Sequence, residues 1–149
     1  MNHNTEKIIL TTITAMLLAQ IIKFIIAAIV NKKTDGKILF STGGMPSSHS
    51  ALVTSLLVSI ALFEGVYNTT FAVALVLSMV VIHDSIGVRY EASKHARSLN
   101  EIKMRLNIIE NIEAEERKLK ESLGHKPLEA LIGSIFGAVI AITLWLILK

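Results

Sequence analysis

The charged residues of this chain are sorted into separate blocks, and that distribution limits the folds open to it. Residues 7–30 hold two charges, residues 65–83 and 130–148 hold none, and residues 89–126 hold most of the rest. A helix of roughly 20 apolar residues spans a bilayer, so the pattern predicts a membrane protein rather than a mixed soluble core. The average composition would not decide this, since 18% charge is only modestly below the soluble average of about 25%.

Four apolar segments predict an all-α membrane bundle with about four spans: Ile8–Val30, Ser50–Phe63, Thr69–Ile86 and Leu128–Leu148. The second is short for a span, which predicts a tilted helix or one that begins below the membrane surface. Glu64–Asn68 is expected to form a tight turn between the second and third spans.

The charged segment 89–124 contains no proline and places apolar residues three and four positions apart: Leu99, Ile102, Leu106, Ile109 and Ile112. This spacing predicts an amphipathic helix outside the membrane, ended by Gly124, that forms a hairpin or contacts another subunit. We therefore expect one domain over residues 1–149, an extramembrane helical insertion over 91–123, and a plausible homodimer.

The basic residues predict an orientation. Four spans place both termini and the Glu64 turn on one side, with loops 31–48 and 87–126 on the other. The first side carries Lys7 and Lys149, whereas nearly all the other basic residues lie on the second. The positive-inside rule therefore predicts cytoplasmic loops and both termini outside.

Two function classes are disfavoured by composition. The chain has no cysteine, which excludes a disulfide framework, a thiolate metal site and a cysteine nucleophile. Its net charge of +3 comes with few aromatic residues, so nucleic acid is not an expected partner. The acidic cluster at 113–116 has the pattern of a solvated helix face, and no metal site is predicted.

The first chemical motif places two glycines, a proline and two serines before a histidine: Gly43, Gly44, Pro46, Ser47, Ser48 and His49. The glycines permit a tight turn, and the proline and serines suit the start of a helix. Free amides at that start, together with the helix dipole, favour phosphate, and His49 could protonate a departing oxygen. The alternative is a capped helix with an incidental histidine.

A second motif pairs His125 with Glu129, four residues later, at the entrance of the last span. A carboxylate on one imidazole nitrogen fixes the tautomer and raises the basicity of the other nitrogen. The alternative is that Glu129 only occupies the favourable first turn of a helix.

Asp84, Arg89 and Lys23 lie near the ends of other spans. Arg89 has the planar fork that suits phosphate oxygens, or it anchors a lipid headgroup. Asp84 is a functional candidate, or a structural ion-pair partner. Lys23 either snorkels to water or points at a site. Under the predicted topology, all the motifs fall at one membrane face, which favours a phosphate site that needs no metal.

These residues resemble the divergent membrane branch of the type 2 phosphatidic acid phosphatase superfamily, which is related to vanadium-dependent haloperoxidases. The resemblance covers nearly the whole chain and is most specific in three segments: Ser41–Ala51, Asp84–Arg89 and Leu119–Glu129. Three departures from the usual pattern are visible. Lys23 lacks a following Arg-Pro, Ser48 stands where glycine is usual, and the third motif is divided between Arg89 and the later histidine–glutamate pair. A literal arginine–histidine spacing also exists at His95, but Leu99 stands where the acid should be.

The resemblance implies a membrane lipid-phosphate phosphatase without a cofactor, with vanadate as a phosphate-mimicking inhibitor. His125 would be the nucleophile oriented by Glu129, with His95 the fallback, and His49 the acid. Asp84 would orient Arg89 or a histidine. The phosphate oxygens would be held by Arg89, Lys23 and the glycine–serine turn: Gly43, Gly44, Ser47 and Ser48. Phosphatidylglycerol phosphate and a polyprenyl phosphate are candidate substrates. The alternatives are a non-catalytic protein that binds or moves anionic lipids and, less favoured, a haloperoxidase-like activity.

Overall fold

The computed structural model describes residues 3–31, 44–105, 119, 121 and 124–149, and these residues form helices joined by turns. The five helices are α1 (His3–Asn31), α2 (Ser48–Phe63), α3 (Thr69–Ile86), α4 (Val88–Arg105) and α5 (Pro127–Leu148). Three helical stretches are long and apolar enough to cross a membrane: His3–Ile29, Thr69–Arg105 and Pro127–Leu148. α2 is apolar but shorter, with 16 residues. The predicted all-α membrane bundle is confirmed.

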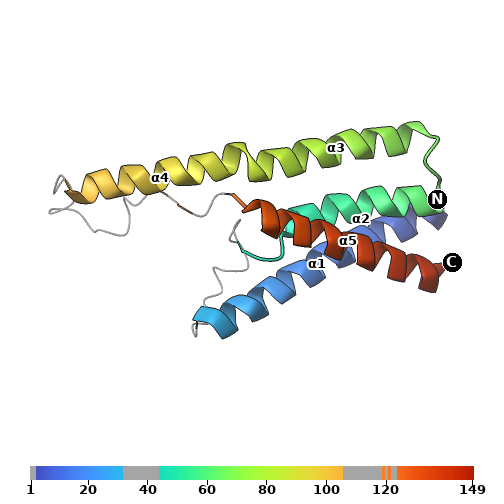
Figure 1. Cartoon of the computed structure of the whole chain (residues 1–149). Helices are drawn as coiled ribbons and strands as arrows, with labels where there is room; N and C mark the ends of the chain where they lie inside the picture. The colour runs from blue at the N-terminus through green and yellow to red at the C-terminus, as the bar shows by residue number, and fades with distance from the viewer. Residues whose placement is uncertain (1–2, 32–43, 106–118, 120, 122–123) are drawn as a thin grey trace.

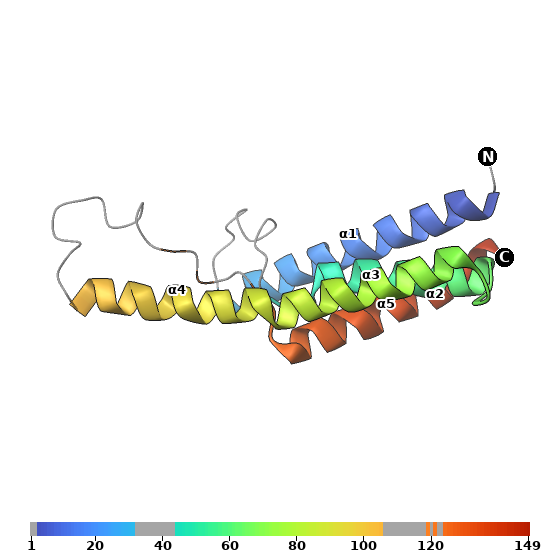
Figure 2. The ribbon, with the colours of Figure 1, turned by 90° about the horizontal axis from the view of Figure 1, so that it is seen from above.

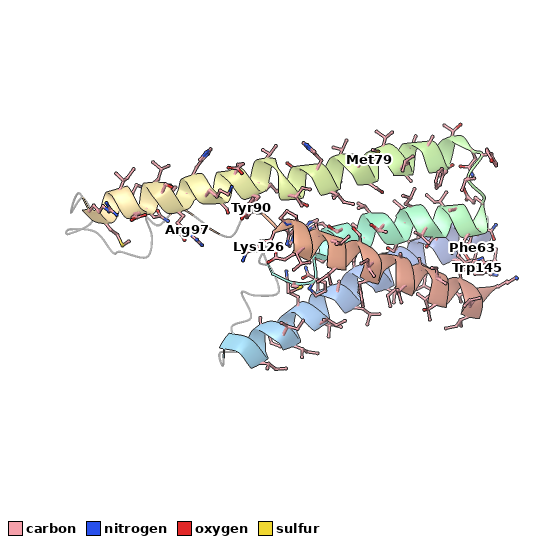
Figure 3. All side chains as sticks on the ribbon, viewed as in Figure 1. Phe63, Met79, Tyr90, Arg97, Lys126 and Trp145 are labelled. Atoms are coloured by element: carbon pink, nitrogen blue, oxygen red, sulfur yellow. The ribbon has the colours of Figure 1, made fainter. Side chains whose placement is uncertain are left out.

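Four helices pack side by side, with α2 and α5 running in one direction and α1 and α3 in the other (Figure 1). Both termini therefore lie at the same end of the bundle, where Phe63 and Trp145 are also found (Figure 3). The opposite end gathers the starts of α2 and α5 and the end of α3. Residues from all three of these chain positions meet there.

Small side chains let the helices approach closely. Gly133 and Gly137 of α5 face the start of α2, and a Cβ on Gly137 would lie 2.3 Å from the carbonyl oxygen of Ala51. A Cβ on Gly133 would lie 2.4 Å from the carbonyl oxygen of Ser47. Two glycines four residues apart are a common means of bringing membrane helices into backbone contact. This contact fixes the two helix starts relative to each other.

The large apolar side chains point mainly away from the bundle. Ile9, Val76, Met79 and Leu131 are among many that stay exposed, while only Ile8, Ile60 and Ala74 form a buried apolar cluster in the described part of the chain. On a water-soluble protein such an exposed apolar surface would promote aggregation, whereas on a membrane protein it is in contact with lipid.

The turn between α2 and α3 follows directly from its sequence. Gly65 has a φ of +87°, a conformation that favours glycine, and the Asn68 side chain caps α3 by accepting the Phe71 N–H at 2.7 Å.

The charged segment 89–124 differs from the amphipathic helix that its sequence predicts. Val88–Arg105 continues almost directly from α3, with one irregular residue at Gly87, and the two together project well past the bundle (Figure 2). Their 37 residues correspond to about 55 Å of helix, well beyond a hydrocarbon core of about 30 Å. The described residues 119, 121 and 124 are not helical, so the expected helix up to Gly124 is wrong. Leu99 and Ile102 of the predicted apolar stripe are exposed, and its other members lie outside the described residues.

Candidate active site

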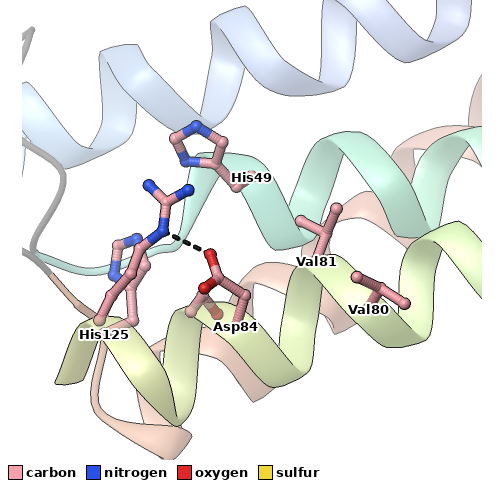
Figure 4. A pocket seen from close by; sticks show the side chains of 7 residues that line it. His49, Val80, Val81, Asp84 and His125 are labelled. Carbon is pink, nitrogen blue, oxygen red and sulfur yellow. Dashed lines mark hydrogen bonds and ion pairs between the residues drawn. The ribbon is translucent and has the colours of Figure 1, made fainter. Parts of the chain in front are cut away.

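A cavity of about 240 Å³ opens where the starts of α2 and α5 meet the junction of α3 and α4 (Figure 4). It is lined by residues from three separate parts of the chain: His49, Val80, Val81, Asp84, Ser85, Arg89 and His125. The two histidines, the aspartate and the arginine singled out by the sequence therefore share one cavity. Its remaining side chains are two valines and a serine of α3.

His49 is placed by the capped start of α2. Ser47 is the N-cap, and its Oγ accepts hydrogen bonds from the Ser50 N–H at 3.2 Å and from the Ser50 hydroxyl at 3.0 Å. The Ser47 N–H donates to the carbonyl oxygen of Glu129 at 3.2 Å. Ser47 is thus fully used in holding α2 to α5, and it does not line the cavity. The predicted role of its amide in binding phosphate is not supported, because that N–H already has an acceptor.

Arg89 and Asp84 form a hydrogen-bonded ion pair from the Arg89 Nε to the Asp84 Oδ2, drawn as a dashed line in Figure 4. Of the two partners considered for Asp84, an arginine or a histidine, the structure shows the arginine. The pair uses only the Nε–H of the guanidinium, which carries four further N–H donors. Both side chains are partly open to solvent, so an anion could reach Arg89.

His125 is buried and held on two sides. Its backbone N–H donates to the carbonyl oxygen of Ser85 at 3.0 Å, and its Nδ1 lies 3.1 Å from the Glu129 Oε2. The same Glu129 oxygen accepts the Lys126 N–H at 3.3 Å. Glu129 therefore combines the two roles that the sequence presented as alternatives: it stabilises the first turn of α5 and orients the imidazole.

Gly124 allows His125 to lie where it does. A Cβ on Gly124 would stand 2.4 Å from the backbone nitrogen of Tyr90 and 2.6 Å from the carbonyl carbon of Arg89. Any larger residue would force the chain away from α4 and carry His125 with it. This role could not be predicted from the sequence because a glycine after a polar segment is also typical of a helix end. Its position directly before the histidine was the available signal.

Lys23 and Gly44 flank the cavity without lining it. Lys23 is 3% exposed, so its side chain does not snorkel into solvent, and its Cδ would lie 3.3 Å from a Cβ on Gly44. Gly44 has a φ of +102° and sits at a neighbouring polar groove. Ser48 is buried at the first turn of α2, and Gly43 lies outside the described residues. His95 is exposed on α4 and does not line the cavity.

The charges around His49 are mainly positive. Arg89 and Lys23 are cationic and close enough to interact with it electrostatically. The described carboxylates at the site are engaged, since Asp84 pairs with Arg89 and Glu129 with His125. Several cationic groups around one small opening attract an anionic ligand.

The fold and the cavity together define a helical integral membrane protein with a histidine–arginine site suited to an oxyanion. The chain matches the Divergent PAP2 family over residues 4–140, and it belongs to that family. It is also 36% identical over 145 residues to the uncharacterized membrane protein YuiD of Bacillus subtilis (strain 168), covering 91% of this chain and 92% of that protein. No solved structure matches the chain. The predicted membership of a divergent PAP2-related membrane branch is confirmed.

Proposed function

We propose that this protein is a membrane lipid-phosphate phosphatase that acts through a phosphohistidine intermediate. The observation that carries the proposal is the cavity shared by His49, Arg89 and His125, with Glu129 at hydrogen-bonding distance from the His125 Nδ1. Three separate chain segments build it, and each of these side chains has a role in transferring a phosphoryl group.

His125 would act as the nucleophile. A proton on Nδ1, donated to Glu129, leaves the lone pair of Nε2 available to attack phosphorus. As the new N–P bond forms, the bond from phosphorus to the lipid oxygen breaks, and His49 donates a proton to that oxygen. Water then attacks the phosphohistidine, His49 accepts its proton, and inorganic phosphate leaves with His125 restored.

The phosphoryl oxygens would be held mainly by Arg89. Its free N–H donors suit two oxygens at once, and Asp84 keeps the guanidinium in place. Ser48 and His49 are the first two residues of α2, whose N–H groups have no acceptor within the helix. Lys23 contributes positive potential. These groups stabilise the charge that develops in the transition state.

The membrane setting favours a lipid substrate. The side chains proposed to bind and transfer phosphate line the same cavity as Val80 and Val81, on a helix whose outer face is apolar. The excess of basic residues in the polar loops supports a cytoplasmic cavity with both termini outside, and therefore a substrate in the inner leaflet.

The test is phosphate release by the purified full-length protein in lipid nanodiscs. The substrate panel contains phosphatidic acid, phosphatidylglycerol phosphate and a polyprenyl phosphate. We expect vanadate-sensitive release, lost in His125→Ala and slowed by about 10²- to 10⁴-fold in His49→Ala. The matched control is His95→Ala, which removes an exposed histidine outside the cavity and should keep full activity.

Full activity in folded His125→Ala would refute the nucleophile, and loss of activity in His95→Ala would transfer that role to His95. Binding or translocation of lipid phosphates without any release would refute the enzyme and favour a lipid-binding or transport protein. Halide oxidation dependent on added vanadate would indicate the haloperoxidase-like activity instead.

A further inference from the structure

Asn100 is buried on a helix that projects beyond the bundle. It is 5% exposed, whereas its neighbours Leu99 and Glu101 are exposed. Its amide makes three hydrogen bonds to residues about 20 positions later. The Oδ1 accepts the Leu119 N–H at 3.0 Å, and the Nδ2 donates to the Leu119 carbonyl at 2.9 Å and to the Glu121 Oε1 at 2.9 Å.

These bonds fasten the chain that leads back to α5. We call the described residues Leu119, Glu121 and Gly124–Lys126 the return segment. Arg97 adds an ion pair to Glu121 at 3.5 Å. Tyr90 and Arg97 of α4 and Lys126 of the return segment line one polar groove, and Figure 3 labels these three residues.

The attachments continue to the cavity itself. Gly124 packs against the backbone of Arg89 and Tyr90, and the next residue, His125, donates its N–H to Ser85. The return segment is therefore fastened to α4 at Asn100, packed on it at Gly124 and bonded to α3 at His125. The second attachment is a close backbone approach and the third is one hydrogen bond, whereas the first involves three hydrogen bonds.

Asparagine suits this position for a chemical reason. A primary amide offers one acceptor and two donors, and so it can pair with both the N–H and the C=O of a single backbone residue. Aspartate lacks the donors, and alanine would leave the Leu119 N–H and carbonyl without these partners.

We propose that Asn100 is a positioning residue for His125, acting through the return segment. It does not touch the cavity, whose lining residues lie nearer the bundle. Its amide holds the chain on α4 so that His125 lies between Ser85 and Glu129 with a fixed ring orientation. The catalytic consequence rests on the proposed phosphatase function, but the positioning of His125 does not.

The first experiment reads the position of His125 without using activity. Diethyl pyrocarbonate modification is followed at each histidine by mass spectrometry in the full-length protein. We expect Asn100→Ala to raise the modification rate of buried His125 by about tenfold, because three hydrogen bonds to the return segment are lost. The control is Glu101→Gln, whose exposed side chain bonds Arg105 of the same helix and no other residue in the part of the chain that the structure describes. An unchanged rate in Asn100→Ala, or an equal rise in the control, overturns the proposal.

The second experiment separates positioning from a general loss of folding. The chain has no cysteine, so Asn100→Cys combined with Leu119→Cys provides one disulfide in place of the amide bonds. Oxidised double variant should protect His125 again, and reduced double variant should not. Failure of the disulfide to protect His125 overturns the proposal even if Asn100→Ala is unstable.

Phosphatase kinetics then distinguish this proposal from the function on which it draws. Where wild type releases phosphate, Asn100→Ala should lower kcat by about 10- to 100-fold with KM nearly unchanged, because the phosphate-binding groups stay in place while the nucleophile is displaced. The oxidised cysteine pair should recover the rate. Altered reactivity of His125 without turnover in any variant would support positioning and refute the phosphatase.

Discussion

The two halves of the cavity are held together by different means. On one side, α2 and α5 meet through small residues, and Gly133 and Gly137 bring the two backbones into direct contact. On the other side, α4 holds the return segment through Asn100, Arg97 and the close approach at Gly124. The first contact lies within the bundle, and the second lies largely beyond it.

The difference shows how each half responds to change. Backbone contact between helices tolerates no added atoms, because neither helix can move without disturbing the whole bundle. Hydrogen bonds to a non-helical segment can be lost one at a time, and the segment can shift locally. Changes at α2–α5 should therefore affect folding, and changes at the return segment should first affect the position of His125.

The largest expected effect comes from Gly137→Leu. Its Cβ would lie 2.3 Å from the Ala51 carbonyl oxygen, so α5 must separate from α2 and the bundle should fail to form. Thermal unfolding and monodispersity of the purified protein measure this. Val139→Leu serves as the control because Val139 is exposed on the same helix, and it should behave as wild type. A stable, monodisperse Gly137→Leu protein would contradict the close-contact role.

An intermediate effect is expected from Gly124→Ala. The added methyl group would stand 2.4 Å from the Tyr90 nitrogen and displace the return segment, while the α2–α5 contact stays intact. Phosphate release should fall about 100-fold with little change in melting temperature. Gly65→Asn is the matched control, since asparagine tolerates the φ of +87° there and no atom lies within 4 Å. Unfolding as severe as that of Gly137→Leu would remove the distinction between the two halves.

The smallest effect is expected from Ser78→Ala. The buried Ser78 hydroxyl lies 3.0 Å from the Val53 carbonyl oxygen of α2 and 2.7 Å from the Ala74 carbonyl oxygen of its own helix. Removing a hydrogen bond between membrane helices costs about 0.6 kcal/mol on average, so the free energy of unfolding should fall by about that amount. Thr143→Ala loses a hydroxyl that bonds only its own helix and should show a smaller change. A loss comparable with that of Gly137→Leu would show that α3 depends on this bond far more than expected.

The helical bundle could be predicted from the sequence because membrane-spanning helices are recognised by their length and apolar content. The short α2, the turn at Glu64–Asn68 and the proline at the start of α5 all follow from local rules. The structure of segment 88–124 could not be predicted from the sequence. Its apolar spacing predicted an amphipathic helix ended by Gly124, but the described residues 119, 121 and 124 are not helical, and the first two of them bond Asn100 of α4 from 19 and 21 positions away.

At the candidate site too, some residues could be predicted from the sequence and others could not. His49, Asp84, Arg89 and His125 could be assembled from span topology, because each stands near the end of an apolar segment. Ser47 was assigned to phosphate, but its N–H bonds the Glu129 carbonyl, a partner 82 positions away that no local pattern reveals. Gly124 and Asn100 were missed because close approach and side-chain pairing with a distant backbone depend on the folded path.

The hydrogen bond from the His125 N–H to the Ser85 carbonyl has a consequence for how the chain can vary in length. It joins the point at which the polypeptide leaves the bundle after α3 to the point at which it rejoins the bundle before α5, so the two ends of the intervening chain are already held together. Closing a longer flexible loop costs only about 0.6 kcal/mol for each doubling of its length. Residues could therefore be added at the far end of this excursion with little cost to the cavity at its base.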